Sequence, residues 1–110
     1  MPFDVPPLRD MAVFHYQQAA EKALKGFLTW RDQPFQWTHD LLQLIGQCEQ
    51  LDASFIQLHD AAMRLTPYAS EFRYPADTEE PTPEDTAIAA QQAEAVMSFV
   101  RARLPREVHP

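Results

Sequence analysis

Glycine is scarce in this sequence, with 2 Gly among 110 residues. Glycine supplies many of the tight turns that join neighbouring strands. Ala, Gln, Leu and Glu are abundant instead, and all four are good helix formers. The 10 Pro stand mainly at the ends and between helical patterns, where they act as breaks. The composition therefore favours helices over a sheet.

Cysteine is also scarce, and long apolar runs are absent from the sequence. The single cysteine, Cys48, cannot form an internal disulfide, so nothing indicates an oxidising compartment. It lies in a leucine-rich pattern and is interpreted as a small core residue. No apolar run approaches the roughly 18 residues of a membrane span, and the N-terminus lacks a basic-then-apolar signal. We therefore expect a cytoplasmic protein that does not cross a membrane.

Basic residues are fewer than acidic ones. The chain has 9 Lys and Arg against 16 Asp and Glu, a formal net charge of -7. A general nucleic-acid binder shows a basic field, so this balance argues against DNA binding. It leaves room for a small local basic site.

The most informative stretch is FHYQQAAEKALKGFL, residues 14–28. Its apolar residues recur at steps of 3 and 4, which predicts an amphipathic helix. The apolar stripe consists of Val13, Tyr16, Ala20, Ala23, Phe27 and Trp30. A mixed seam of polar and apolar residues runs beside it, and comprises Phe14, Gln17, Glu21, Leu24 and Leu28.

Length and pattern predict one all-α domain over residues 1–110, an antiparallel four-helix up-and-down bundle. The expected helices cover about 9–31, 38–50, 52–73 and 83–104. Between and around them we expect an extended segment at 1–8, an acidic loop at 76–83 and a frayed tail at 105–110.

Local signals mark the helix ends. Thr38 is the expected N-cap of the second helix, with Asp40 in its first turn. Pro67 is expected to bend the third helix. The clearest start is at Thr82, a cap followed by Pro83 at the first helical position and an acidic residue three positions after the cap. In the connection after the first helix, we expect Phe35 and Trp37 to pack on the bundle.

Three blocks together resemble a HEPN domain. They are FHYQQAAEKALKGFL, then Thr38-His39-Asp40-Leu41, then Phe72-Arg73-Tyr74-Pro75. They occur in the order of the family and span most of the chain. HEPN domains resemble one another in pairing side by side, so the resemblance implies a homodimer.

One feature departs from the HEPN pattern. Relatives usually carry a further helix before the FHxQQ helix, and here only about ten Pro-rich residues precede it. We therefore expect the first helix to be missing, which leaves a face that a second chain covers. The contact candidates are Phe14, Leu28, Trp30, Phe35 and Trp37.

The candidate site is a cleft between helices. Glu21 lies on the mixed seam, where partial burial requires a partner, and Arg73 is the expected one. The alternative is a solvated helix face on which Glu21 and Lys25 form only weak pairs. The expected ligand-binding residues are Gln17, Glu21, Lys25, His39, Arg73 and Tyr74.

Arg73 and His39 each allow two interpretations. Arg73 either clamps Glu21 or helix-end carbonyls, or anchors a phosphate through its two-pronged guanidinium. His39 is either a packed helix-start residue, or it helps to bind phosphate or transfer a proton. Tyr74 offers a stacking surface.

No metal site, cofactor site or phosphate loop is expected from the pattern of ligand residues. HEPN ribonucleases resemble one another in an Arg, a polar residue, three to five further positions and a His. Arg103 to His109 has that spacing, but Leu104 takes the polar position and Pro105 interrupts the segment. We interpret the match as chance and predict no catalytic residues.

The resemblance implies a non-catalytic binding or regulatory module. Small HEPN proteins similar to this one are often paired with a minimal nucleotidyltransferase, as a nucleotide-binding subunit or as half of a toxin–antitoxin pair. Two alternatives stay open: a metal-independent ribonuclease toxin, and a truncated domain that serves only self-association.

Overall fold

Helices make up the ordered core of the computed structural model, which describes residues 6–35, 37–69 and 81–105. No strand occurs within these ranges, so the all-α four-helix bundle is confirmed. The elements are α1 (Pro6–Trp30), α2 (Leu41–Leu51), the 3-10 helix η2 (Ala53–Leu58), α3 (His59–Leu65), the 3-10 helix η3 (Thr66–Tyr68) and α4 (Pro83–Arg101).

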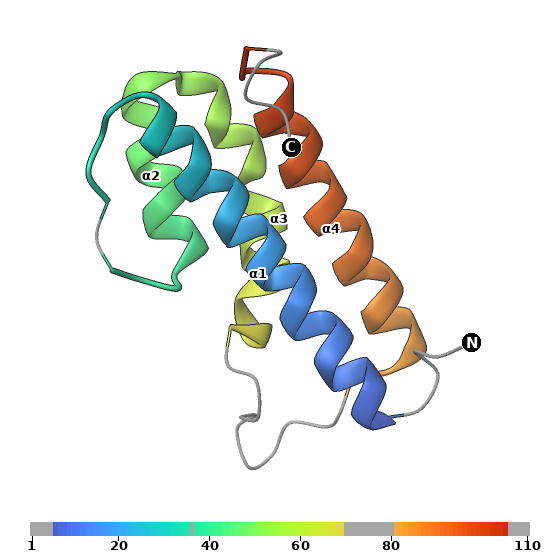
Figure 1. Cartoon of the computed structure of the whole chain (residues 1–110). Coiled ribbons are helices and arrows are strands. Elements are labelled where there is room, and N and C mark those ends of the chain that lie inside the picture. Colours follow the sequence, from blue (N-terminus) through green and yellow to red (C-terminus); the bar gives the residue numbers. More distant parts are fainter. Residues whose placement is uncertain (1–5, 36, 70–80, 106–110) are drawn as a thin grey trace.

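The first connection departs from the predicted up-and-down order. Gln17 of α1 contacts His39 just before α2, and Leu24 contacts Cys48 farther along α2, so α1 and α2 run in the same direction. The connection makes this possible because its described residues, 31–35 and 37–40, return along the two helices before α2 begins (Figure 1). α3 runs the opposite way, and α4 lies beside α1 and parallel to it (Figure 1).

α1 begins earlier than predicted, at Pro6, so the expectation of an extended segment is wrong for residues 6–8. Prolines are tolerated in a first turn because those amides have no acceptor within the helix. At the other end Asp32 adopts a left-handed φ of 58°. The amide of Gln33 then donates to the carbonyl of Leu28 at 2.9 Å, a Schellman-type ending.

α2 is capped by Asp40, and the prediction of Thr38 as its N-cap is wrong. The Asp40 side chain accepts a hydrogen bond from the amide of Leu42 at 3.0 Å. Thr38 instead accepts from the amide of Asp40, also at 3.0 Å, and so holds the turn that leads into the helix. A carboxylate also suits the positive end of the helix dipole better than a hydroxyl.

The predicted third helix is divided into η2, α3 and η3 over the described residues. Asp52 caps η2 by accepting from the amide of Ser54 at 3.0 Å. Pro67 does more than bend the helix, because α3 ends at Leu65 and a single 3-10 turn follows. Proline lacks the amide that would extend the α-helical ladder.

α4 begins as predicted. The Thr82 hydroxyl accepts from the amide of Asp85, and the Asp85 carboxylate accepts from the amide of Thr82, each at 3.0 Å. Pro83 occupies the first turn. This is a complete capping box, which satisfies two amides that have no other acceptor. α4 ends at Arg101, three residues before the predicted end.

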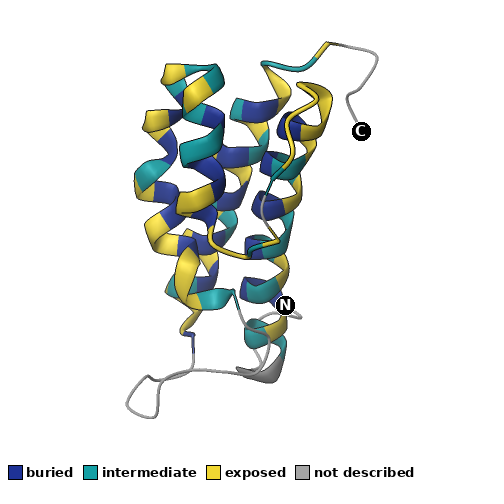
Figure 2. Ribbon diagram, turned by 90° about the vertical axis from the view of Figure 1, so that its left-hand side faces the viewer, coloured by how far each residue is buried: buried dark blue, intermediate teal, exposed yellow. Residues whose placement is uncertain are grey.

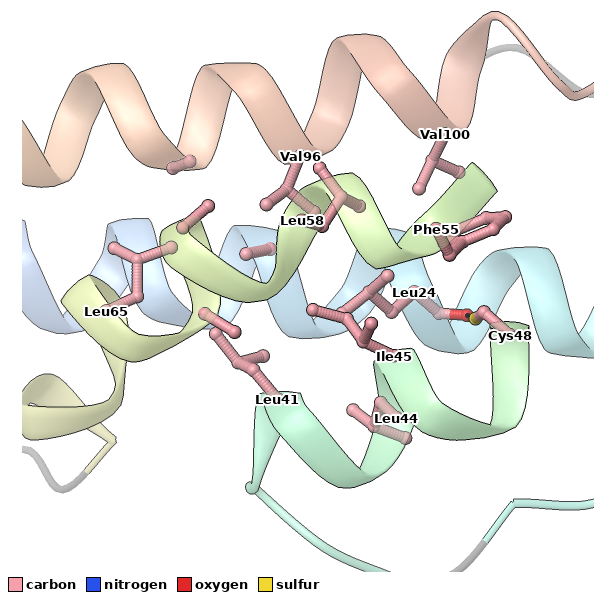
Figure 3. Packing of buried hydrophobic residues seen from close by; sticks show 14 of the residues in the cluster. Leu24, Leu41, Leu44, Ile45, Cys48, Phe55, Leu58, Leu65, Val96 and Val100 are labelled. Atoms are coloured by element: carbon pink, nitrogen blue, oxygen red, sulfur yellow. Dashed lines mark hydrogen bonds between the residues drawn. The ribbon is translucent and has the colours of Figure 1, made fainter. Parts of the chain in front are cut away.

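The core lies between the four helices, and each helix turns one face toward it (Figure 2). Figure 3 shows side chains from all four helices meeting there. The buried side of α1 is wider than the predicted apolar stripe. Val13, Ala20 and Phe27 of that stripe are buried, and the mixed seam is buried too from Gln17 to Leu28, because α2 packs against it. Leu28 is fully buried in this core, so the prediction that it is available for contact with a second chain is wrong.

Arg103 fastens the end of α4 to the start of η2. Its Nε donates to the Asp52 carboxylate at 3.1 Å, and its Nη2 donates to the hydroxyl of Ser54 at 2.9 Å. Its guanidinium carbon lies 3.4 Å from the centre of the Phe99 ring. These contacts give Arg103 a structural role, and His109 of the proposed chance motif lies outside the described residues.

Over the described ranges, no helix is both long enough and apolar enough to cross a membrane.

Candidate functional site

Glu21 is the centre of the candidate site. It lies in the middle of α1 on the side that faces α2, and its side chain is 5% exposed. A buried carboxylate needs partners for its charge and its oxygen lone pairs. Lys25, one helical turn later, supplies the first, with its Nζ 2.8 Å from Oε2 of Glu21.

His39 supplies the second partner from outside α1. Its Nδ1 lies 3.0 Å from Oε1 and 3.1 Å from Oε2 of Glu21. The returning connection places it there, because the Thr38 and Asp40 turn that caps α2 holds the backbone on both sides of His39. The imidazole is 59% exposed, so the pair joins a buried carboxylate to a ring that solvent reaches.

Two glutamines complete the network. The buried side-chain amide of Gln17 donates to the backbone carbonyl of His39 at 3.1 Å and lies 3.4 Å from Oε1 of Glu21. The Gln18 amide donates to Oε1 of Gln17 at 2.9 Å. In the described part of the chain, no buried side-chain nitrogen or oxygen is left without a hydrogen bond. The network is therefore fully satisfied, which favours one arrangement of its members.

Two aromatic rings flank the ammonium group of Lys25. Its Nζ lies 5.5 Å from the centre of the Phe35 ring and 5.2 Å from that of Trp37. Phe35 packs against the core, as predicted. Trp37 is 90% exposed, so the prediction that it packs on the bundle is wrong. An indole this exposed offers its ring to solvent beside the polar network.

Glu21 is ionised at neutral pH. Burial by itself raises the pKa of this carboxyl, but hydrogen bonds and charge attraction from Lys25 and His39 outweigh that effect and lower it. With Glu21 charged, Nδ1 of His39 is the donor in their hydrogen bond, and Nε2 is left for proton exchange or for a ligand.

The structure brings together four of the six predicted site residues: Gln17, Glu21, Lys25 and His39. Arg73 and Tyr74 lie outside the described residues, so their meeting with Glu21 stays a prediction. Among the described residues, Glu21 is bonded to Lys25 and His39, with longer hydrogen bonds from Gln17 and Gln18.

Sequence reasoning overlooked two members of the site. Gln18 is not among the predicted site residues, although it follows Gln17 directly and lies three residues before Glu21, within side-chain reach on a helix. Trp37 was assigned to packing. Nothing in the sequence around Trp37, two residues before His39, indicates that its side chain is exposed.

Residues that could hold a metal do not gather at this site. Within the described ranges, no three side chains of His, Cys, Asp or Glu converge on one point. His59 pairs with Glu49 elsewhere on the bundle. The site therefore presents the ammonium of Lys25, the imidazole of His39 and the exposed ring of Trp37 around the ionised Glu21, whose charge Lys25 balances.

Comparison with known proteins agrees with the helical architecture. No curated protein and no solved structure matches the chain significantly. The family model described as "HEPN domain" matches residues 8–103, from the first turn of α1 to Arg103, which follows α4. Because this match covers most of the 110 residues, the chain belongs to the HEPN domain family.

Proposed function

We propose that this HEPN protein is a non-catalytic binding module that takes up a nucleotide beside Glu21, as partner subunit of a minimal nucleotidyltransferase. One observation carries the proposal: the exposed indole of Trp37 lies next to Lys25 and near the accessible imidazole of His39. Aromatic rings stack on nucleobases whatever their identity, and each such contact contributes about 1–3 kcal/mol.

The charges favour a single nucleotide over a polymer. The net charge of -7 repels a long phosphate backbone, which requires many lysines and arginines for its neutralisation. A nucleotide needs only a local contact. His39 offers one at Nε2, because Nδ1 is held by the Glu21 carboxylate and the side chain is 59% exposed.

Tryptophan fluorescence tests this proposal directly. The chain has 2 Trp, so a Trp30→Phe background leaves Trp37 as the only tryptophan. We expect AMP or ATP to quench Trp37, and we expect His39→Ala to weaken binding by about tenfold, the loss of one charge-assisted hydrogen bond. His15→Ala, an exposed histidine of α1, is the matched control.

Absence of quenching by any nucleotide at millimolar concentration would count against the site. The partner is tested separately: a neighbouring reading frame that encodes a small nucleotidyltransferase, and co-purification of its product with this chain, would support the pairing.

A second function is favoured by one observation. The carboxylate of Glu21 orients Nδ1 of His39, which leaves Nε2 positioned as in a general acid–base histidine. RNA cleavage also needs a group that stabilises charge on the phosphate. Within the described residues no arginine is bonded to either member of this pair.

We therefore propose that the ribonuclease alternative is the weaker one. RNA degradation by the purified protein in the presence of a chelator, abolished by His39→Ala, would reverse that order.

A further inference from the structure

A groove runs between α1 and α4 on a different side of α1 from the Glu21 network. It encloses about 420 Å³, and its walls are mainly apolar. Apart from Lys22, the residues that line it on α1 are small, whereas those on α4 and just after it are larger. The lining residues are Ala19, Lys22, Ala23, Gly26, Met97, Val100, Arg101 and Leu104.

Two cationic side chains line this groove, and neither pairs with a carboxylate of the described residues. Lys25, Arg64 and Arg103 each pair with an acidic side chain. Lys22 and Arg101 form no ion pair or hydrogen bond with another described side chain, although the chain has 16 acidic residues. Both are exposed, and they flank the same apolar surface from opposite helices.

The shape of the groove suits a helix. Ala19 and Gly26 are seven positions apart, which corresponds to about 10 Å along α1, or two turns of a helix lying against it. The small residues of α1 let another backbone approach closely. The groove is open along one side, whereas sites for small molecules usually enclose most of the ligand.

The charges indicate what kind of helix fits. We propose that the α1/α4 groove binds an amphipathic helix of a partner protein, with apolar side chains in the groove and Asp or Glu side chains paired with Lys22 and Arg101. Helix-in-groove recognition commonly combines apolar anchors with flanking charges. A second copy of this chain fits less well, because a two-fold contact centred here brings the same cations of both copies together.

This inference does not rest on the proposed nucleotide site. The groove and the Glu21 network share no residue. Binding of a helix in the groove therefore succeeds or fails independently of nucleotide quenching at Trp37.

A pair of synthetic peptides tests the charge requirement. One is an 18-residue helical peptide with Leu at steps of 3 and 4 and Glu along both edges, and the other carries Lys in place of every Glu. Fluorescence anisotropy with the full chain is expected to show at least about tenfold tighter binding of the Glu peptide. The double variant Lys22→Glu, Arg101→Glu is expected to reverse this preference.

A pair of glycine substitutions tests the location. A Cβ added at Gly26 or at Gly46 meets no atom within 4 Å, so neither substitution creates a clash at its first side-chain atom. Gly26→Leu fills the groove and is expected to weaken binding of the Glu peptide by at least about tenfold. Gly46→Leu makes the same change on α2 and is expected to leave binding unchanged. Thermal unfolding of both variants confirms that each is folded.

Three results would overturn the proposal. Equal binding of the two peptides would remove the charge argument, and unchanged binding by Gly26→Leu would remove the location. Dissociation of a homodimer by Gly26→Leu, seen in sedimentation equilibrium, would assign the groove to a second copy of this chain instead.

Discussion

Nδ1 of His39 lies 3.0 Å from Oε1 of Glu21, and this contact joins the middle of α1 to the residue just before the cap of α2. The Glu21 carboxylate thus holds the connection between α1 and α2 against α1. The same contact brings Trp37 to the side of Lys25. The candidate site and the path of the chain between α1 and α2 are therefore stabilised by the same hydrogen bonds.

Stability should depend on pH through Glu21. The folded-state pKa of this carboxyl is lowered from 4.5, so its contribution is complete above that value and is lost as the pH falls through the folded-state pKa. We expect Glu21→Gln to lower the free energy of unfolding by about 1–3 kcal/mol at pH 7, because Lys25 and His39 lose their partner. Urea unfolding between pH 3 and 7 should show the difference shrinking in acid.

Glu94→Gln, an exposed carboxyl of α4, is the control for this experiment. If wild type and Glu21→Gln differed by the same free energy of unfolding down to pH 3, the ionised form of Glu21 would not be the source of that stability.

Glu21 and Lys25 should be energetically coupled. A double-mutant cycle on Glu21→Gln and Lys25→Met is expected to give a coupling of about 0.5–3 kcal/mol, because each change removes the same ion pair. A second cycle with Arg73→Met tests the prediction that Arg73 joins this cluster. Additive effects in the second cycle would show that Arg73 does not interact with Glu21. The first cycle would still measure the coupling between Glu21 and Lys25.

Arg103 should matter for stability more than its neighbour Arg101. Arg103→Met loses the hydrogen bonds to Ser54 and the stacking on Phe99, so we expect a loss of about 1–3 kcal/mol in urea unfolding. Arg103→Lys should recover only part of it, because an ammonium lacks the planar fork. Arg101→Met is the matched control. An equal loss of unfolding free energy in that variant would show that the contacts of Arg103 with Ser54 and Phe99 add nothing specific.

Cys48 should be unreactive in the folded protein. Burial raises the pKa of its thiol to about 12, so almost none of it is thiolate at pH 8. We expect a thiol reagent such as DTNB to react with the native chain only as fast as it unfolds, and at once in concentrated urea. Rapid labelling of the native protein, with its near-UV circular dichroism intact, would contradict the buried position.

Asp32→Gly should stabilise the end of α1. Asp32 has a φ of 58°, a conformation that glycine adopts without a steric penalty. We expect a gain of up to about 1 kcal/mol in the free energy of unfolding. Thr29→Gly, inside the last turn of the helix, should instead cost a similar amount. A loss of stability in Asp32→Gly would indicate that the aspartate side chain makes a contribution of its own.

Helix content and the start of α4 could be predicted from the sequence because their causes are local. Thr82 and Asp85 are three residues apart, and the capping box that they form needs no other part of the chain. The positions of Gln17, Glu21 and Lys25 on one side of α1 follow from helical spacing in the same way. The sequence by itself therefore determined the helix content, the start of α4 and the part of the candidate site that lies on α1.

Only the tertiary structure decided how far the buried side of α1 extends beyond the predicted stripe and which way α2 runs. By helical spacing, either Tyr16 or Glu21 could face the core. Glu21 is the more deeply buried of the two because α2 packs against its side of α1. His39 reaches Glu21 because the connection returns along α1, a contact between residues 18 positions apart. Trp37 is exposed for the same reason. Such relations depend on the packing of distant segments, which a local pattern of residues does not specify.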